Sequence, residues 1–188
     1  LTKLFEEINY LNEGRNAERF ALNFQDDPTV KVPAIYWRYS SIRVLTLEWI
    51  DGFKLTDTER IEALGLDTAS LIKTGVTSGL RQLLEHGFFH ADPHPGNLFA
   101  LPDGRMGYID FGMMDQLDQD TKETIVSCVV DLINKDYQSL AQAFVKLGFL
   151  APNTDIQPII PALEAVLGQA IGESVGDFNF KTITDQFS

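Results

Sequence analysis

Two aspartates and one asparagine stand close together between His90 and Gly112, in an order that suits phosphoryl transfer. Asp92 lies in a loop marked by prolines and a glycine, Asn97 follows five positions later, and Asp110 comes after a turn. Carboxylate and amide oxygens are the hard ligands that Mg²⁺ prefers, and a carboxylate can also take a proton from an attacking hydroxyl. These three side chains could therefore hold a metal-phosphate complex and activate the group that attacks it.

The spacing matches two motifs that protein kinases use together. His90, Asp92 and Asn97 follow the catalytic-loop order H-R-D-x-x-x-x-N, and Asp110 heads an Asp-Phe-Gly segment. Under this interpretation Asp92 is the catalytic base, while Asn97 and Asp110 are the catalytic metal ligands. Either motif alone occurs often by chance or marks an ordinary turn. Both motifs in the right order, separated by a hairpin, favour a kinase-like site, with His90 in a supporting role.

A metal-dependent hydrolase is the competing interpretation of the same loop. His90, Asp92 and His94 alternate as H-x-D-x-H, and on a strand they would point three ligands to one side, as a zinc or iron site requires. Pro93 and Pro95 argue against a strand because prolines remove ladder donors. This interpretation also gives no role to the asparagine and the second aspartate.

The elements before the loop are expected to position it. Apolar residues at helical spacing predict one helix over residues 3–24, and aromatic and β-branched residues predict strands over 34–39 and 42–50. A capping box from Thr56 predicts a short helix. Asp67 is expected to cap a longer helix, stopped by a glycine, that delivers the loop from its buried face. The residues expected on that face are Ile72, Val76, Leu80, Leu83 and Leu84.

A hairpin and three helices are expected in the rest of the chain. Strands over 98–101 and 106–109 should bring the second aspartate back beside the asparagine. Asp118 should cap the first of two helices within 119–148, and a third is expected between residues 152 and 172. No A-P-E motif, which builds the peptide platform of protein kinases, follows Asp-Phe-Gly. A small molecule is therefore a better expected substrate than a protein.

Composition excludes several classes of protein. The net charge of −12 argues against a nucleic-acid partner, because phosphate backbones are bound by clustered basic residues. No apolar run reaches the roughly 18 residues of a membrane span. A single cysteine, Cys128, rules out an internal disulfide framework. With 44% apolar residues, the chain is expected to be one globular kinase-like piece.

Four strings resemble the UbiB family of atypical kinases, also called aarF-domain-containing kinases: HADPHPGN, YIDFG, NEGRNAERF and VLTLEWIDG. The resemblance implies an α+β, protein-kinase-like fold, with a partial N-lobe over 1–50 and a helical C-lobe over 51–188. It implies ATP and Mg²⁺ as cofactors and a kinase or ATPase activity in isoprenoid-quinone or prenyl-lipid metabolism. It also implies a peripheral membrane surface, in the cytoplasm or in a plastid- or mitochondrial-type organelle.

The same resemblance assigns further residues to the nucleotide. Glu7 and Glu13 in the first helix would approach it, and Glu48 and Ile50 would offer backbone groups to adenine. Asn9 stands where the family carries an Asp. No glycine-rich loop or strand lysine is recognised, so the piece is expected to be inactive by itself. A nucleotide-gated binding protein without turnover is the alternative.

Overall fold

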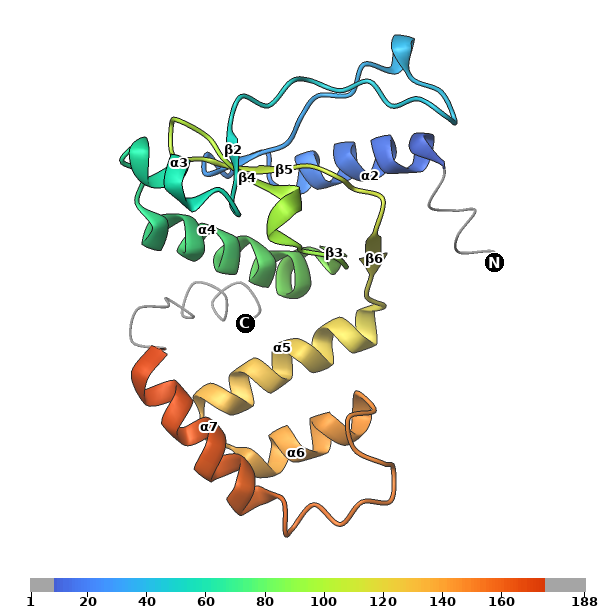
Figure 1. Ribbon diagram of the computed structural model, residues 1–188. Helices are drawn as coiled ribbons and strands as arrows, with labels where there is room; N and C mark the ends of the chain where they lie inside the picture. The colour runs from blue at the N-terminus through green and yellow to red at the C-terminus, as the bar shows by residue number, and fades with distance from the viewer. Residues whose placement is uncertain (1–8, 175–188) are drawn as a thin grey trace. The chain divides into compact units, whose positions relative to one another are not determined.

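The structure, a computed structural model, describes residues 9–174, which divide into two compact units (Figure 1). One unit ends at Leu117 and the other begins at Asp118. The first combines helices with two small sheets, and the second is built from helices. The predicted lobes, 1–50 and 51–188, divide the chain at another position, and they stay a prediction.

Helix α2 (Tyr10–Asn23) is the first described element. Asn9 caps it, and its side-chain oxygen accepts a hydrogen bond from the Leu11 N–H at 3.1 Å. Phe20 lies on its buried face, fully removed from solvent. This helix confirms the described part of the one expected over 3–24, and the first residues of that expectation lie outside the described part of the chain.

The strands expected over 34–39 and 42–50 are wrong. What forms instead is a 3-10 helix, Trp37–Tyr39, and two isolated bridges, Ile35 with Leu47 and Ser41 with Val44. Trp37 turns onto α2, where a Cβ at Gly14 would lie only 2.6 Å from the indole ring. Its Nε1–H donates to the Glu18 carboxylate at 2.5 Å. Packing against α2 thus overrides the strand propensity of these aromatic residues.

A four-stranded sheet follows the order β1-β5-β4-β2. Its strands are β1 (Val30–Lys31), β2 (Phe53–Lys54), β4 (Leu98–Ala100) and β5 (Met106–Tyr108). β1 runs parallel to β5, and the other pairs are antiparallel. In the β4–β5 hairpin Leu98 lies opposite Tyr108, which confirms the predicted hairpin.

Two helices and a π-helical turn lead to the catalytic loop. They are α3 (Thr58–Ala63), α4 (Thr68–Arg81) and the turn Gln82–His86. Asp57, rather than Thr56, caps α3, because its carboxylate reaches the Arg60 N–H at 3.4 Å. Asp67 caps α4 as predicted, through the Ala69 N–H at 3.0 Å. Gly87 ends the turn at a φ of +60°, a left-handed conformation that glycine adopts at low cost.

The buried face of α4 and the turn after it agrees with the predicted one only in part. Leu84 is buried as predicted, but Ile72 and Val76 are 62% and 49% exposed. Leu71 and Ser78 are buried instead. The apolar stripe of α4 is wider than the surface that α3 and β5 cover, so its outer part lines an open groove of about 600 Å³ in the first unit.

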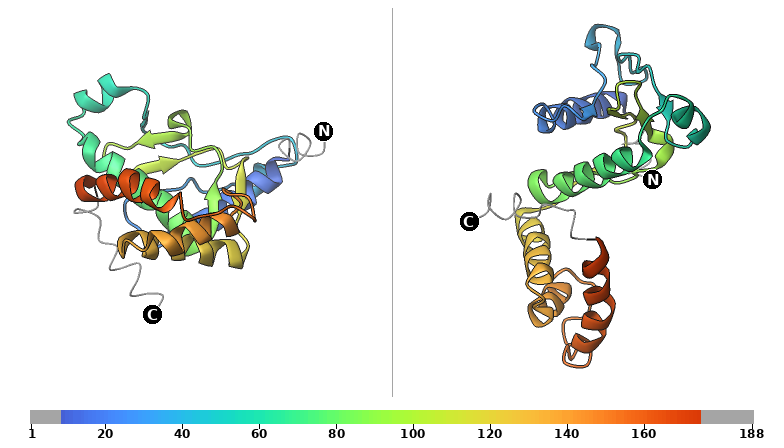
Figure 2. Two further views of the ribbon diagram at one scale, coloured as in Figure 1. Left: turned by 90° about the horizontal axis from the view of Figure 1, so that it is seen from below. Right: turned by 90° about the vertical axis from the view of Figure 1, so that its left-hand side faces the viewer.

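Strand β5 links α4 to α2 (Figure 2). Tyr108 places its ring 5.0 Å from that of Phe20 on α2 and its hydroxyl 2.5 Å from that of Ser78 on α4. Phe111, three residues further along the chain, packs its ring 5.3 Å from that of Phe20. The core of this unit therefore sits directly behind the Asp-Phe-Gly segment.

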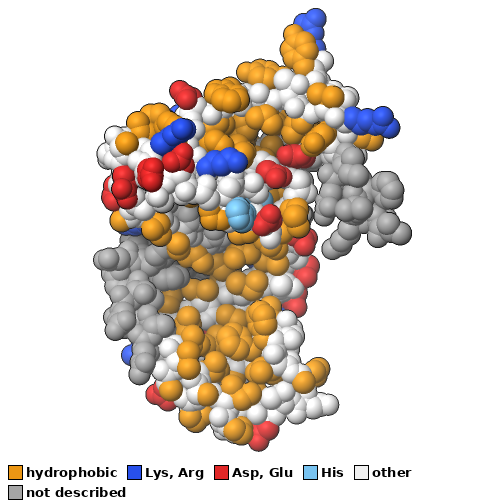
Figure 3. All heavy atoms as spheres, in the orientation of Figure 1, with side chains coloured by type: hydrophobic (Ala, Val, Ile, Leu, Met, Phe, Trp, Pro, Cys, Tyr) orange, Lys and Arg blue, Asp and Glu red, His pale blue; other side chains and the backbone are white. Residues whose placement is uncertain are grey.

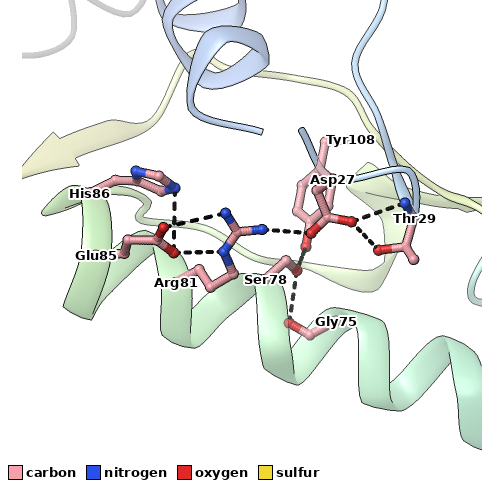
Figure 4. A network of polar contacts seen from close by, with 8 residues as sticks. All are labelled: Asp27, Thr29, Gly75, Ser78, Arg81, Glu85, His86 and Tyr108. Atoms are coloured by element: carbon pink, nitrogen blue, oxygen red, sulfur yellow. Dashed lines mark hydrogen bonds and ion pairs between the residues drawn. The ribbon is translucent and has the colours of Figure 1, made fainter. Parts of the chain in front are cut away.

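A polar network fixes α4 to the segment after α2 (Figure 4). Arg81 donates to Asp27 at 2.7 Å and to Glu85 at 2.6 Å. Burial would raise the pKa of Asp27, but hydrogen bonds from Thr29 and the charge of Arg81 outweigh it and lower that pKa. The network therefore stabilises the ionised form of Asp27.

The second unit consists of α5 (Gln119–Ile133), α6 (Tyr137–Lys146) and α7 (Ile160–Ser174). Asp118 caps α5 through the Thr121 N–H at 2.8 Å, as predicted. α7 begins later than expected, since turns occupy the chain after Pro152. No helix within residues 9–174 has the length and apolar character needed to cross a bilayer.

Candidate active site

The loop that carries Asp92 is held at both ends by local structure. Strand β3 (Phe88–His90) pairs with β6 (Met114–Gln116) and delivers the loop. Gln82, buried in the π-helical turn, accepts the His90 backbone N–H on its side-chain oxygen at 2.9 Å. A 3-10 helix, Pro95–Asn97, then closes the loop. π-helical turns are uncommon and often lie at functional sites, which fits this position.

His90 joins the two motifs. One ring nitrogen, Nε2, lies 2.7 Å from the Asp110 carbonyl oxygen, and the other, Nδ1, accepts the Asp92 N–H at 3.1 Å. A neutral imidazole with its proton on Nε2 satisfies both contacts, so the partners define the tautomer. His90 is 5% exposed. Its buried ring therefore connects the backbones of the two aspartates through two hydrogen bonds, and this connection is called the His90 strut.

The competing hydrolase site does not assemble. Both ring nitrogens of His90 are engaged by backbone groups, and Nδ1 of His94 accepts the Gly96 N–H at 3.0 Å. Within residues 9–174, no three His, Cys, Asp or Glu side chains are grouped as a metal site would need. The structure gives the H-x-D-x-H alternation no support as a ligand set.

Asp110 adopts a left-handed conformation, with a φ of +62°. Such a conformation costs a residue with a side chain on the order of 1 kcal/mol, and it is found where surrounding contacts impose it. Here the Gly112 N–H donates to Asp110 Oδ1 at 3.2 Å. Asp110 as a whole is exposed.

The hairpin brings Asn97 beside Asp110, as predicted, because the Ile109 N–H donates to the Asn97 carbonyl at 3.1 Å. Asp92 and Asp110 are exposed, and none of the ion pairs found within residues 9–174 involves either carboxylate. Carboxylate and amide groups without a basic partner are oxygen donors of the kind that suits a divalent cation. The chemistry of Asp110 and Asn97 therefore fits Mg²⁺.

Of the two acids predicted to approach the nucleotide from the first helix, Glu13 lies near Asp110. Burial, and then the charge of Asp110, raise the pKa of Glu13, and the Phe111 N–H partly offsets this. Its neighbour one turn on, Asn16, donates from Nδ2 to the Phe111 carbonyl at 2.9 Å. Glu7 lies outside the described residues.

Glu48 and Ile50 lie at a different place in the first unit. The Glu48 carboxylate pairs with Lys31 at 2.7 Å, which lowers the pKa of Glu48. The backbone N–H of Glu48 donates to the Ala34 carbonyl at 2.8 Å. Ile50 packs toward β5, where a Cβ at Gly107 would lie 3.3 Å from it. No hydrogen bond or ion pair described for residues 9–174 joins Glu48 or Ile50 to the catalytic loop.

Asn16 and Gln82 were missed by sequence reasoning. Asn16 stands three positions after Glu13, so both side chains share one face of α2, and that spacing could have identified it. Gln82 gives no comparable signal, because its contact to His90 depends on the π-helical turn.

The chain is similar to known proteins along most of its length. A model of the ABC1 atypical kinase-like domain matches residues 1–144. An uncharacterized protein of Synechocystis sp. is 75% identical over 186 residues, and the chloroplastic protein ACTIVITY OF BC1 COMPLEX KINASE 1 of Arabidopsis thaliana is 49% identical over 186 residues. Each match covers 99% of this chain, but only 33% and 27% of these relatives.

A solved structure has a similar fold. It is a Mycobacterium tuberculosis protein in complex with erythromycin, 26% identical in sequence, with a TM-score of 0.61. The match covers 87% of this chain and 41% of that protein.

Proposed function

Because the chain belongs to the ABC1 atypical kinase-like family, we propose that it forms the ATP- and Mg²⁺-binding core of an atypical kinase or ATPase. The predicted family and the predicted α+β, kinase-like fold are both confirmed. The chain spans about a third or less of the curated relatives it matches, so the activity proposed is that of the complete protein.

One observation supports the proposal: the His90 ring contacts the backbones of Asp92 and Asp110, and the Asn97 carbonyl accepts the N–H of the residue before Asp110. These contacts support a shared site for Asp92, Asn97 and Asp110. In that site Asp110 and Asn97 would hold Mg²⁺, and Asp92 would orient or deprotonate the attacking oxygen. A bound Mg²⁺ supplies positive charge that neutralises the transferring phosphate. The chain's part is to fix these oxygens before the nucleotide arrives.

Two further pairs of residues complete the nucleotide site in this proposal. The Glu48 carbonyl and the Ile50 N–H would bind adenine, as backbone groups do in kinases, while the Glu48 carboxylate keeps its ion pair with Lys31. Glu13, and with it Glu7, would approach the phosphates from the side of α2. Glu13 is suited to that place because it already lies near Asp110.

The substrate proposed is a small molecule of lipid or isoprenoid-quinone metabolism rather than a protein. The absence of an A-P-E motif after Asp-Phe-Gly supports this, because Asp118 already caps α5 six positions beyond Gly112. The name of the Arabidopsis relative contains the word chloroplastic, which supports an organellar site of action. A nucleotide-gated binding role without turnover is the alternative.

Asp110→Asn in the complete protein tests the metal site, with Asp115→Asn as its matched control. Asp115 is an exposed acid on β6, and it undergoes the same loss of charge. Loss of even an indirect partner of a metal ligand weakens metal binding by about 10- to 100-fold. We therefore expect Mg²⁺-dependent ATP affinity to fall at least about tenfold in Asp110→Asn and to stay unchanged in Asp115→Asn.

Calorimetric titration of ATP with and without Mg²⁺ measures this effect. Unchanged Mg²⁺-ATP affinity in a folded Asp110→Asn protein would refute the metal assignment. If the wild type binds Mg²⁺-ATP but releases no phosphate with any lipid or partner fraction, the binding role without turnover replaces the enzyme.

The segment between α2 and β2 supports the proposed membrane surface. It exposes Trp49 by 87%, Tyr39 by 63% and Ile42 by 54%, and Figure 3 shows hydrophobic and basic side chains together over this segment. Arg38 and Arg43 lie in it, and no acidic residue occurs between positions 28 and 47 although the chain carries a net charge of −12. Exposed aromatic rings beside arginines suit the interface of an anionic bilayer.

Sedimentation of the complete protein with phosphatidylglycerol vesicles tests this surface. Each basic residue near an anionic membrane contributes about 1 kcal/mol, so Arg38→Glu with Arg43→Glu should lower binding at least about tenfold. Arg15→Glu on α2, outside this segment, is the control; it reverses one charge where the double variant reverses two. Equal binding of the double variant and the wild type would exclude this segment as the contact.

A further inference from the structure

One side chain of helix α2 forms a hydrogen bond with the backbone of the Asp-Phe-Gly segment. Asn16 Nδ2 donates to the Phe111 carbonyl at 2.9 Å, a contact between residues 95 positions apart. The same helix packs the Phe20 ring 5.3 Å from that of Phe111. α2 therefore holds both the side chain and the carbonyl of the residue that follows Asp110.

The carbonyl that Asn16 holds belongs to the peptide unit that joins Phe111 to Gly112. The N–H of the same unit donates to Asp110 Oδ1 at 3.2 Å. A trans peptide is planar, and its C=O and N–H point in opposite directions. Fixing the carbonyl against α2 thus also fixes the direction of the N–H, which in turn holds one oxygen of the Asp110 carboxylate.

His90 acts on the neighbouring peptide unit. Its Nε2 binds the Asp110 carbonyl at 2.7 Å, on the side of the catalytic loop. Phe111 lies between the two anchored units, and the left-handed residue Asp110, at a φ of +62°, directly precedes them. A strained conformation of this kind persists where the surrounding structure holds the backbone in place.

We propose that Asn16 is a positioning residue for the Asp110 carboxylate: its amide orients the Phe111–Gly112 peptide, so that α2 sets which Asp110 oxygen faces the metal. This inference rests on the proposed function for the role of the metal, but the backbone contact itself does not. It goes beyond the acids of α2, because Asn16 acts through backbone and carries no charge.

Asn16→Ala tests this, with Asn12→Ala as the matched control. Asn12 lies one turn earlier on α2 and is exposed, and among the described hydrogen bonds its side chain contacts only Arg15, at 3.4 Å. Asn12→Ala therefore makes the same side-chain change without removing a contact to the Asp-Phe-Gly segment. Asn16→Gln keeps the donor on a longer arm and serves as the rescue variant.

Hydrogen exchange of the complete protein without metal or nucleotide is the first measurement. One net hydrogen bond corresponds to about a fivefold change in the opening equilibrium. The Gly112 amide should therefore exchange about fivefold faster in Asn16→Ala than in the wild type, with partial rescue in Asn16→Gln and no change in Asn12→Ala. Equal exchange in the two alanine variants overturns the inference, and unchanged exchange in α4 shows that each variant is folded.

A Mg²⁺ titration of ATP binding is the second measurement. Asn16→Ala should raise the Mg²⁺ concentration at half-saturation about fivefold while ATP affinity in EDTA stays the same. Faster Gly112 exchange with an unchanged Mg²⁺ requirement overturns the positioning role. If the ATP affinity of the wild type does not depend on Mg²⁺, the proposed function is refuted instead. The hydrogen-exchange data then test only whether Asn16 orients the Phe111–Gly112 peptide.

Discussion

His90→Phe removes the strut between the two aspartates without emptying its space. Phenylalanine keeps a ring of similar size at a position that is 5% exposed, and it lacks both ring nitrogens. The Asp110 carbonyl and the Asp92 N–H each lose a partner, at 2.7 and 3.1 Å respectively. The backbone bond from His90 N–H to Gln82 stays, since it does not involve the imidazole.

The size of the effect follows from those two contacts. A net hydrogen bond contributes about 1 kcal/mol, and an unsatisfied buried group costs about 1–3 kcal/mol. Both orphaned groups belong to exposed residues that water can reach in part. We therefore expect the free energy of unfolding to fall by about 1–3 kcal/mol, with the loss concentrated at the catalytic loop.

Urea unfolding, combined with hydrogen exchange of the Asp92 and Gly112 amides, measures this loss. His94→Phe is the control, because His94 is exposed and its ring contacts only the nearby Gly96 N–H at 3.0 Å. The control should lose no more than about 1 kcal/mol, the usual size of a capping contact. Equal losses in both variants, or unchanged exchange at Asp92 in His90→Phe, would show that the ring does not tie the two motifs together.

Three shorter predictions concern other positions. Asp92→Asn should lower ATP turnover about 10²- to 10⁴-fold with little change in ATP affinity, and turnover at the wild-type rate would exclude Asp92 as the base. Asp27→Asn should lower the free energy of unfolding by about 1 kcal/mol at neutral pH. Because the folded pKa of Asp27 lies below its ordinary value of 3.8, the difference in unfolding free energy between variant and wild type, measured by urea titration, should vanish as the pH falls through that folded pKa. Tyr108→Phe should cost about 1 kcal/mol through the lost contact with Ser78, and a thermal midpoint equal to that of the wild type would contradict it.

The loop and hairpin of the site could be predicted because their signals are local. Proline and glycine fix the turns around Asp92, and the Asp118 and Asp67 carboxylates cap the helices that follow them in sequence. Register in the β4–β5 hairpin follows from its short turn, and just beyond the paired strands Asn97 contacts Ile109, the residue before Asp110. None of these features needs a partner more than about 20 residues away in the chain.

The contacts that align the site are of another kind. The +62° φ of Asp110 has no signal in its own neighbourhood, because Asp is only one of the residues that tolerate this region. The contacts around it are long-range: His90, 20 positions earlier, contacts the Asp110 carbonyl, and Asn16 contacts the carbonyl of Phe111, 95 positions later. The family resemblance placed Glu13 near the site, but it did not show that the Asn16 amide on the same face of α2 reaches the Phe111 carbonyl.

The wrong prediction of strands over 34–39 and 42–50 also shows that local sequence patterns do not reveal distant contacts. Their aromatic and β-branched residues have strand propensity, yet propensity of this kind mainly reports how well a side chain packs on a pleated surface. In this unit Trp37 finds a better surface, because Gly14 leaves α2 without a side chain at the point of contact and Glu18 accepts the indole N–H. A Cβ at Gly14 would meet the ring at 2.6 Å, so Gly14→Ala should force Trp37 off the helix and loosen the segment that holds Glu48 and Ile50. The tertiary contact, rather than the local pattern, decides the conformation of the segment that would bind adenine.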